Sequence, residues 1–242
     1  MSRLGSGSGR HTRVATSGKN PIKGNRSEPM NLQIGLQIGG PGLRFYPDYF
    51  SRDTQMAVLA AIRGVLAKAP LFTPRMPKSG QPMSVGMSNC GSLGWISDER
   101  GYRYEKLHPE IGQPWPAIPD LLVQLWDEVA RYPHAPEACL INYYDPTAKM
   151  GLHQDRDEAD FAAPVVSLSL GDSCLFRVGG GKRRDPTRSI RLNSGDVLVL
   201  GGDTRLAFHG VDRIYPGTST LLAEGGRINV TMRRVTRPQA PA

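Results

Sequence analysis

The chain has 242 residues and a formal net charge of +8, and it is 39% hydrophobic, 7% aromatic and 21% charged. This length and composition predict one globular domain with some length to spare. They exclude a membrane-spanning helix, because no apolar run approaches roughly eighteen residues. The N-terminus also lacks the apolar core of a secretory signal, so we expect a cytoplasmic protein.

Residues 1–44 are expected to form a disordered basic N-terminal arm. Within it, residues 1–30 hold six Lys or Arg and one acidic residue, Glu28, which is a net charge of +5. The segment has almost no apolar periodicity, so it cannot bury enough surface to offset its ordering entropy. Its composition favours nonspecific contact with a polyanion. An organellar transit peptide has a similar composition, but we find no amphipathic helix here.

The folded domain is expected to span residues 45–237, followed by a short tail at residues 238–242. The chain has three cysteines, an odd number without the spacing of a metal site. This usage fits a reducing compartment better than a disulfide framework. We therefore expect Cys90, Cys139 and Cys174 to be reduced core residues.

Apolar spacing predicts two helices in this domain. The first covers residues 51–68, opens with a Ser/Asp start and ends before Pro70. The second covers residues 119–131. Their apolar positions, which we expect to face the core, are Val58, Leu59, Ile62, Val65 and Leu66 in the first helix and Leu122, Leu125, Trp126 and Val129 in the second.

Between the helices, the residues from Trp95 to Tyr104 are predicted to form a hairpin with its turn near residues 99–101. Met83 and Met87 precede it. Aromatic side chains beside a turn usually pack against the domain. Without further context, packing is the interpretation that we favour for these rings.

After Cys139 the sequence changes to short runs rich in Val, Ile, Leu and Thr, separated by Gly, Pro, Asn and Asp. Such runs predict β-strands. They are ACLINYY at 138–144, PVVSLSL at 164–170, CLFRVGG at 174–180, SIRLNS at 189–194, DVLVLGG at 196–202 and RINVTMRRV at 227–235. Their spacing predicts a mainly β domain, a barrel or sandwich of antiparallel strands with the helices packed on one side.

A candidate metal site lies in the motif Leu-His-Gln-Asp. His153 and Asp155 are two residues apart, so they point to the same side of an extended backbone, and His209 follows in Ala-Phe-His-Gly. Two imidazoles and one carboxylate form the facial triad of nonhaem Fe(II) oxygenases. Chance alone supplies about 0.3 His-x-Asp pairs in a chain of this composition. A solvated polar loop with an unrelated histidine is therefore the alternative.

The last predicted strand strengthens the metal interpretation. It places Ile228, Val230 and Met232 on one face and Arg227, Asn229, Thr231 and Arg233 on the other. Outside a barrel, the polar face of such a strand would normally face water. Two guanidinium groups also suit a small dicarboxylate, because each can grip a carboxylate with two hydrogen bonds. A triad followed by this clamp predicts a 2-oxoglutarate oxygenase.

Several segments between residues 80 and 235 together resemble the AlkB-type 2-oxoglutarate and iron dependent dioxygenases, which repair alkylated nucleic acid bases. The segments are MSVGMSNCGSLGW at 83–95, CLINYY at 139–144, LHQDRDE at 152–158, VSLSLG at 166–171, GGGKR at 179–183, FHG at 208–210 and RINVTMR at 227–233. The resemblance implies a double-stranded β-helix, or jelly roll. It implies His153, Asp155 and His209 as Fe(II) ligands, with molecular oxygen as the second substrate. It assigns 2-oxoglutarate to Asn142, Tyr144, Arg227, Asn229 and Arg233.

The same resemblance implies how a base would be held. The Watson–Crick edge is hidden inside a duplex, so an enzyme that oxidises it needs a flipped or single-stranded base and a ring to stack on. The resemblance assigns stacking to Trp95, strand contacts to Tyr102 and Arg183, a place near a cationic base to Asp157, and the pocket to Met87 and Leu140. The expected activity removes N-methyl groups from 1-methyladenine and 3-methylcytosine as formaldehyde, while 2-oxoglutarate becomes succinate. The expected partner is alkylated single- or double-stranded DNA, with RNA left open, and we expect a monomer.

Two other functions remain open from the sequence. A 2-oxoglutarate oxygenase acting on a protein or a small metabolite would keep the triad and the arginine clamp, but it would not need rings that stack on bases. A basic module without enzymatic activity would bind nucleic acid through residues 1–30 and would use the barrel as a scaffold.

Overall fold

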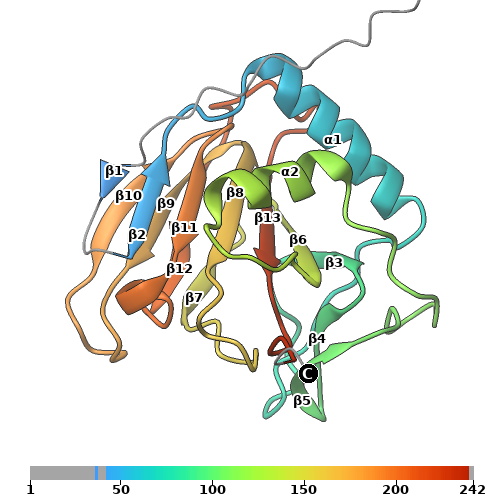
Figure 1. Cartoon of the computed structure of the whole chain (residues 1–242). Coiled ribbons are helices and arrows are strands. Elements are labelled where there is room, and N and C mark those ends of the chain that lie inside the picture. Colours follow the sequence, from blue (N-terminus) through green and yellow to red (C-terminus); the bar gives the residue numbers. More distant parts are fainter. Residues whose placement is uncertain (1–35, 38–41, 240–242) are drawn as a thin grey trace, which may run out of the picture. The chain divides into compact units, whose positions relative to one another are not determined.

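The computed structural model describes residues 36–37 and 42–239, which build three antiparallel sheets (Figure 1). The seven-stranded sheet has the order β1 (Leu36–Gln37), β2 (Leu43–Tyr46), β11 (Val197–Leu200), β8 (Val165–Gly171), β13 (Arg227–Arg233), β6 (Ala138–Tyr144) and β3 (Gly86–Gly91). The four-stranded sheet has the order β10 (Arg188–Leu192), β9 (Ser173–Val178), β12 (His209–Tyr215) and β7 (Met150–His153). A hairpin of β4 (Gly94–Asp98) and β5 (Gly101–Glu105) forms the third sheet. The arrangement is the expected jelly roll.

An apolar core lies between the seven-stranded and four-stranded sheets. Phe45 and Leu140 contribute from the larger sheet, and Phe176, Ile190 and Val211 contribute from the smaller one. Successive side chains of a strand point to opposite faces of the sheet, so every second residue of a strand can face this core. Burial of these side chains, at about 25 cal/mol per Å² of apolar surface, supplies the main attraction between the sheets.

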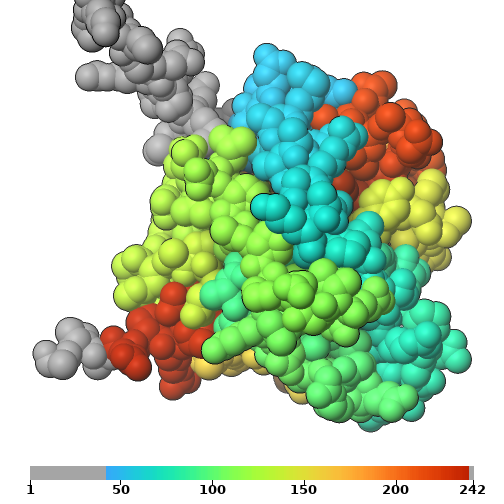
Figure 2. Space-filling view, turned by 90° about the vertical axis from the view of Figure 1, so that its right-hand side faces the viewer, coloured from blue at the N-terminus to red at the C-terminus, as the bar shows by residue number. Residues whose placement is uncertain are grey.

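Two helices cover the outer face of the larger sheet (Figure 1). Helix α1 (Arg52–Leu66) begins after Ser51, whose hydroxyl oxygen accepts a hydrogen bond from the backbone N–H of Thr54. Helix α2 (Asp120–Val129) buries Trp126 completely, and the indole N–H donates to the carbonyl of His134. Figure 2 shows α1 running down one side of the molecule, with the green segment that follows β5 below it. No helix of the described residues is long and apolar enough to cross a membrane.

The helices, the hairpin and six strands lie where the sequence predicts them, within a few residues at each end. Five strands lie outside the predicted runs: β1 and β2, which begin among the residues assigned to the arm, and β3, β7 and β12, each for a different reason. Strand β3 contains Ser88 and Asn89, residues more typical of turns, and both are fully buried. Strand β7 has only four residues, one of them glycine. In β12 a bulge shifts the pairing register, so buried Val211 and Ile214 are three residues apart rather than two.

The expected boundary of the N-terminal arm needs a correction. Strand β2 starts at Leu43, and β1 at residues 36–37 pairs with it, so ordered strands lie within the residues assigned to the arm. Strand β2 pairs with β11 at the edge of the larger sheet, and β1 pairs with β2. The composition of residues 1–44 could not predict these strands, because their hydrogen-bond partners begin with β11, far along the chain. The other residues of the expected arm, 1–35 and 38–41, lie outside the described residues, as do residues 240–242 of the expected tail. The three cysteines are free and buried, as expected.

Candidate active site

A cavity of about 730 Å³ opens between the two large sheets and contains the candidate site. All the site residues predicted from the sequence line it: Met87, Trp95, Tyr102, Leu140, Asn142, Tyr144, His153, Asp155, Asp157, Arg183, His209, Arg227, Asn229 and Arg233. They come from both large sheets, the β4–β5 hairpin and two loops. The structure thus brings together residues that are up to 146 positions apart in the chain, from Met87 to Arg233.

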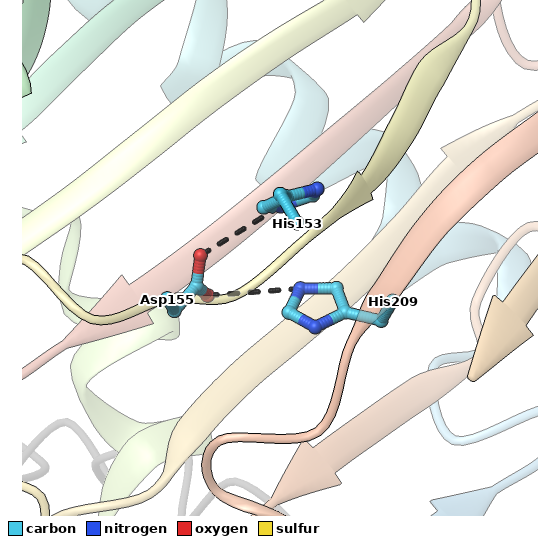
Figure 3. Close-up of side chains that lie close together, drawn as sticks. All are labelled: His153, Asp155 and His209. Carbon is cyan, nitrogen blue, oxygen red and sulfur yellow. Dashed lines mark ion pairs between the residues drawn. The ribbon is translucent and has the colours of Figure 1, made fainter. Parts of the chain in front are cut away.

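His153, Asp155 and His209, which all line this cavity, form a compact cluster (Figure 3). One ligand atom from each residue lies within 4.8 Å of the others. His153 ends β7 and His209 begins β12, and the two are direct partners in the sheet. The Nε2 atoms of the histidines lie 3.8 Å and 3.9 Å from the two carboxylate oxygens of Asp155. Among the described residues, this is the group with the geometry of a metal site.

Backbone carbonyls hold both imidazoles in the tautomer that a metal site needs. The Nδ1 atom of His153 lies 2.9 Å from the carbonyl oxygen of Gly151, and that of His209 lies 2.9 Å from the carbonyl of Ala207. Because a carbonyl can only accept, each Nδ1 carries the proton and donates it. The lone pair of each Nε2 therefore remains free, on the side of Asp155.

The charges of the cluster also favour metal binding. Burial lowers the pKa of His209 to about 4, so its imidazole is neutral at pH 7. Burial alone would raise the pKa of Asp155, but the nearby Arg233 and the two histidines hold it well below its usual range. Neutral imidazoles and an ionised carboxylate are the protonation states that bind a divalent metal.

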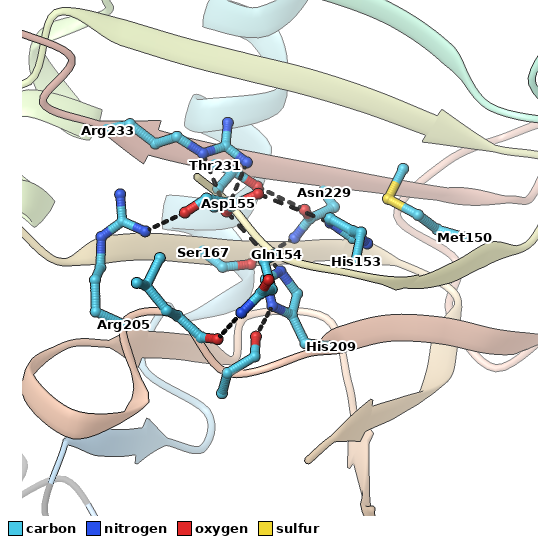
Figure 4. Close-up of polar contacts among 12 residues, drawn as sticks. Met150, His153, Gln154, Asp155, Ser167, Arg205, His209, Asn229, Thr231 and Arg233 are labelled. Atoms are coloured by element: carbon cyan, nitrogen blue, oxygen red, sulfur yellow. Dashed lines mark hydrogen bonds and ion pairs between the residues drawn. The ribbon is translucent and has the colours of Figure 1, made fainter. Parts of the chain in front are cut away.

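Arg233, on strand β13, forms an ion pair with Asp155 (Figure 4). Its Nε and Nη2 atoms donate to Oδ2 of Asp155 at 3.1 Å and 2.9 Å. Both side chains are more than nine-tenths buried. A buried charge is stable only when it is paired, so each of these residues requires the other.

A second carboxylate, Glu158, balances the remaining buried charge. It lies 3.4 Å from Nε of Arg233, accepts a hydrogen bond from Arg205 at 3.1 Å and accepts another from the hydroxyl of Tyr104. Arg205 also donates to the backbone carbonyl of Asp155. The four charges therefore form a neutral buried group that holds the loop after His153.

The polar face of β13 lines the cavity rather than facing solvent. Among the described residues, the buried side-chain atoms without a hydrogen-bond partner are Oδ1 of Asn142, Nε of Arg227 and Nη1 of Arg233. An unpaired buried polar atom costs about 1–3 kcal/mol. All three belong to the residues predicted to hold a dicarboxylate, and two are guanidinium donors that suit carboxylate oxygens. The residues present thus fit an acidic ligand.

The outer part of the cavity carries an aromatic pair. The rings of Trp95 and Tyr102 are stacked, with centroids 5.5 Å apart and planes 18° apart. The indole N–H of Trp95 donates to Asp157 at 2.8 Å, and the side chain of Asn89 makes two hydrogen bonds to the backbone of Trp95. Arg183 reaches the cavity from the β9–β10 loop, where it donates to the carbonyl of Leu152.

Sequence reasoning missed four residues that position the site. Asn89 holds Trp95, Ser169 accepts from Arg227 at 2.8 Å, and Glu158 and Arg205 belong to the buried charge group. Asn89, Glu158 and Ser169 lie inside the motifs that carry the family resemblance, so their motifs were a usable signal. Arg205 lies outside those motifs and acts through partners more than 40 residues away, which no local pattern shows.

Comparisons with known proteins find a matching family and several similar proteins. Residues 42–233 match the 2OG-Fe(II) oxygenase superfamily. The chain is 53% identical over 194 residues to the alpha-ketoglutarate-dependent dioxygenase AlkB homolog of Caulobacter vibrioides, covering 80% of this chain and 88% of that protein. It is 40% identical to alpha-ketoglutarate-dependent dioxygenase AlkB of Escherichia coli, covering 78% and 89%. The solved structure of OsALKBH1 superposes with a TM-score of 0.70 at 32% identity, covering 82% of this chain and 99% of that one.

The buried charge group leads to a prediction about stability. Replacing Glu158 with Ala leaves Arg205 and Arg233 with excess buried positive charge, which we expect to lower the free energy of unfolding by about 3–5 kcal/mol. Asp98→Ala is the matched control, because it removes an ion pair with Arg103 in which the Asp98 side chain is 38% exposed. We expect the control to cost about 1 kcal/mol or less.

Denaturant unfolding of the two variants and the wild type measures both quantities. Equal losses for Glu158→Ala and Asp98→Ala would show that the buried group does not stabilise the site.

Proposed function

The chain belongs to the 2OG-Fe(II) oxygenase superfamily and, within it, to the AlkB-type dioxygenases, and on this basis we propose that His153, Asp155 and His209 are its Fe(II) ligands. The protein is a 2-oxoglutarate and Fe(II) dependent dioxygenase that oxidatively demethylates alkylated nucleic acid bases. Its cofactor is Fe(II), and its cosubstrates are 2-oxoglutarate and molecular oxygen. One observation carries the assignment of residues: a single cavity contains the His153, Asp155 and His209 cluster, the unpaired arginine donors and the aromatic pair.

We assign the cosubstrate to the polar face of β13 and the adjacent face of β6. Arg227 and Arg233 lie six residues apart on one strand face. Each has one buried guanidinium nitrogen without a hydrogen-bond partner among the described residues. Asn142, Tyr144 and Asn229 complete the proposed binding set. When bound, iron would activate molecular oxygen, the oxidant of the reaction, and 2-oxoglutarate would be oxidised to succinate and carbon dioxide. The role of these residues is to neutralise the two carboxylates and to exclude water.

The proposed substrates are 1-methyladenine and 3-methylcytosine, whose methyl groups make the base cationic. Trp95 stacks on the base, and the exposed carboxylate of Asp157 favours the cationic ring over a neutral one. Met87 and Leu140 form the apolar floor of the pocket. Hydroxylation of the N-methyl group gives an unstable hemiaminal, which releases formaldehyde and restores the base.

We also propose how the substrate strand is bound and where the protein acts. Tyr102 and Arg183 line the cavity and hold the strand, and we infer a preference for single strands, since their bases need no unpairing. RNA is a second candidate substrate. The proposed active species is a monomer, because all the proposed site residues belong to one chain. The proposed location is cytoplasmic, supported by three free cysteines.

The first test concerns the metal ligands. Asp155→Ala removes one ligand and also leaves Arg233 unpaired, so we expect loss of both succinate production and base demethylation. Anaerobic addition of Fe(II) and 2-oxoglutarate should give a weak visible charge-transfer band in the wild type and none in the variant. Retained turnover by the variant at saturating iron would refute the ligand assignment.

The second test compares two arginines on opposite faces of one chain segment. Arg227→Lys keeps the charge but loses the planar donors that reach Ser169 and the cavity, so we expect a strongly raised apparent KM for 2-oxoglutarate. Arg234 points away and pairs with Glu137, so Arg234→Lys should change that KM little. Equal effects on KM would contradict the assigned face.

The third test concerns the base. Trp95→Ala removes the stacking ring, so we expect substrate use to weaken by about 1–3 kcal/mol, while 2-oxoglutarate decarboxylation without substrate stays nearly intact. Succinate and formaldehyde release across a panel of methylated oligonucleotides, with free nucleosides as controls, measures both. Turnover with only a protein or metabolite would overturn the nucleic acid assignment.

A further inference from the structure

We propose that the outer face of the four-stranded sheet is a second nucleic acid surface, which binds phosphates of the strand flanking the base in the cavity. We call this surface the basic strip, and it consists of Arg177, Arg191 and Arg213 on the sheet and of Lys182 and Arg184 in the adjoining β9–β10 loop. The inference rests on the proposed function, because it requires that the base in the cavity belongs to a longer strand.

The first observation is the distribution of charge in the folded part of the chain. The net charge is +8 and residues 1–30 carry +5, so residues 31–242 carry +3. Residues 173–192, which form β9, β10 and their loop, contain six Lys or Arg and only one acidic residue, a net charge of +5. The rest of residues 31–242 therefore carries −2. The net positive charge of residues 31–242 is therefore concentrated in this one hairpin.

The second observation is the direction of the side chains on the sheet. Phe176, Ile190 and Val211 are buried in the core between the sheets. Arg191 and Arg213 are exposed, and both pair with the same position of β9, Leu175. Strands lie about 4.8 Å apart, so the two arginines sit about 10 Å apart in one row on the outer face.

The third observation is that these guanidinium groups retain donors for a ligand. Asp212 is the nearby carboxylate, and it is shared: it lies 3.5 Å from Arg213 and 3.9 Å from Arg177. The Arg213 side chain is 60% exposed. Arg191 lies over the ring of Tyr215, 4.6 Å from its centroid. A guanidinium group is planar and more weakly hydrated than an ammonium group, and its paired N–H donors match the oxygens of a phosphate.

The fourth observation is continuity with the cavity. The loop between β9 and β10 carries Lys182, Arg183 and Arg184, and Arg183 lines the cavity and donates to the carbonyl beside His153. Arg177 lies on β9, two residues before this loop begins at Gly179. A strand that leaves the cavity past Arg183 therefore meets the basic strip next. Phosphates are the groups on such a strand that arginines bind without regard to sequence.

The experiment uses the full-length protein loaded with Fe(II) and two single-stranded substrates. One is a trinucleotide with a central 1-methyladenine, and the other is a 20-nucleotide strand with the same central trinucleotide. The test variant combines Arg191→Ala and Arg213→Ala, both outside the cavity lining. The matched control combines Arg63→Ala and Lys68→Ala, which removes the same charge from exposed positions in and just after α1.

We expect the test variant to match the wild type on the trinucleotide and to bind the long strand more weakly. Two lost phosphate contacts, at about 0.7 counterions each, should reduce the slope of log Kd against log salt by about 1.4. The ratio of variant to wild-type Kd should then fall about sevenfold between 50 mM and 200 mM salt. The control should keep the wild-type slope, and a variant with Arg191→Lys and Arg213→Lys should recover most of it.

Two results overturn the basic strip: an unchanged salt slope for the test variant, or an equal loss of activity on the trinucleotide. Failure of the wild type to release formaldehyde from either oligonucleotide would instead overturn the proposed function. Demethylation and salt dependence are separate measurements, so the two failures are distinguishable.

Discussion

The buried pairing of Arg233 with Asp155 is the interaction on which the site depends. Asp155 follows β7 of the smaller sheet, and Arg233 ends β13 of the larger sheet, so the pair connects the two halves of the sandwich at the lining of the cavity. Neither charge is stable there alone. The pairing also keeps Asp155 ionised, which is the state that a metal ligand requires.

Glu158 and Arg205 extend this pair into a neutral group of four charges, and the extension explains how several parts of the site keep their positions. Arg205 holds the backbone of Asp155, while Tyr104 connects Glu158 to the hairpin that carries Trp95. The cluster of His153, Asp155 and His209, the polar face of β13 and the aromatic pair thus share one set of buried hydrogen bonds. Nη1 of Arg233, in this group, and Nε of Arg227, on the same face of β13, have no hydrogen-bond partner among the described residues, so both are available to an acidic ligand.

The smaller sheet has two different faces, and both bear on function. Its inner face supplies Phe176 and Val211 to the core and His209 to the metal cluster. Its outer face carries Arg177, Arg191 and Arg213. Since successive residues of a strand point to opposite faces, one sheet can contribute both to the site in the cavity and to a polyanion surface.

The sequence by itself determined the helices, the hairpin, six strands and fourteen of the residues that line the cavity. These features depend on local periodicity, or on short motifs such as Leu-His-Gln-Asp and the alternating strand at 227–233. Only the tertiary structure decided that the polar face of this strand is buried, that β12 contains a bulge, and that Glu158, Arg205 and Ser169 position the site. The physical reason is that the hydrogen-bond partners of these residues lie on other strands, at separations that only the folded chain closes.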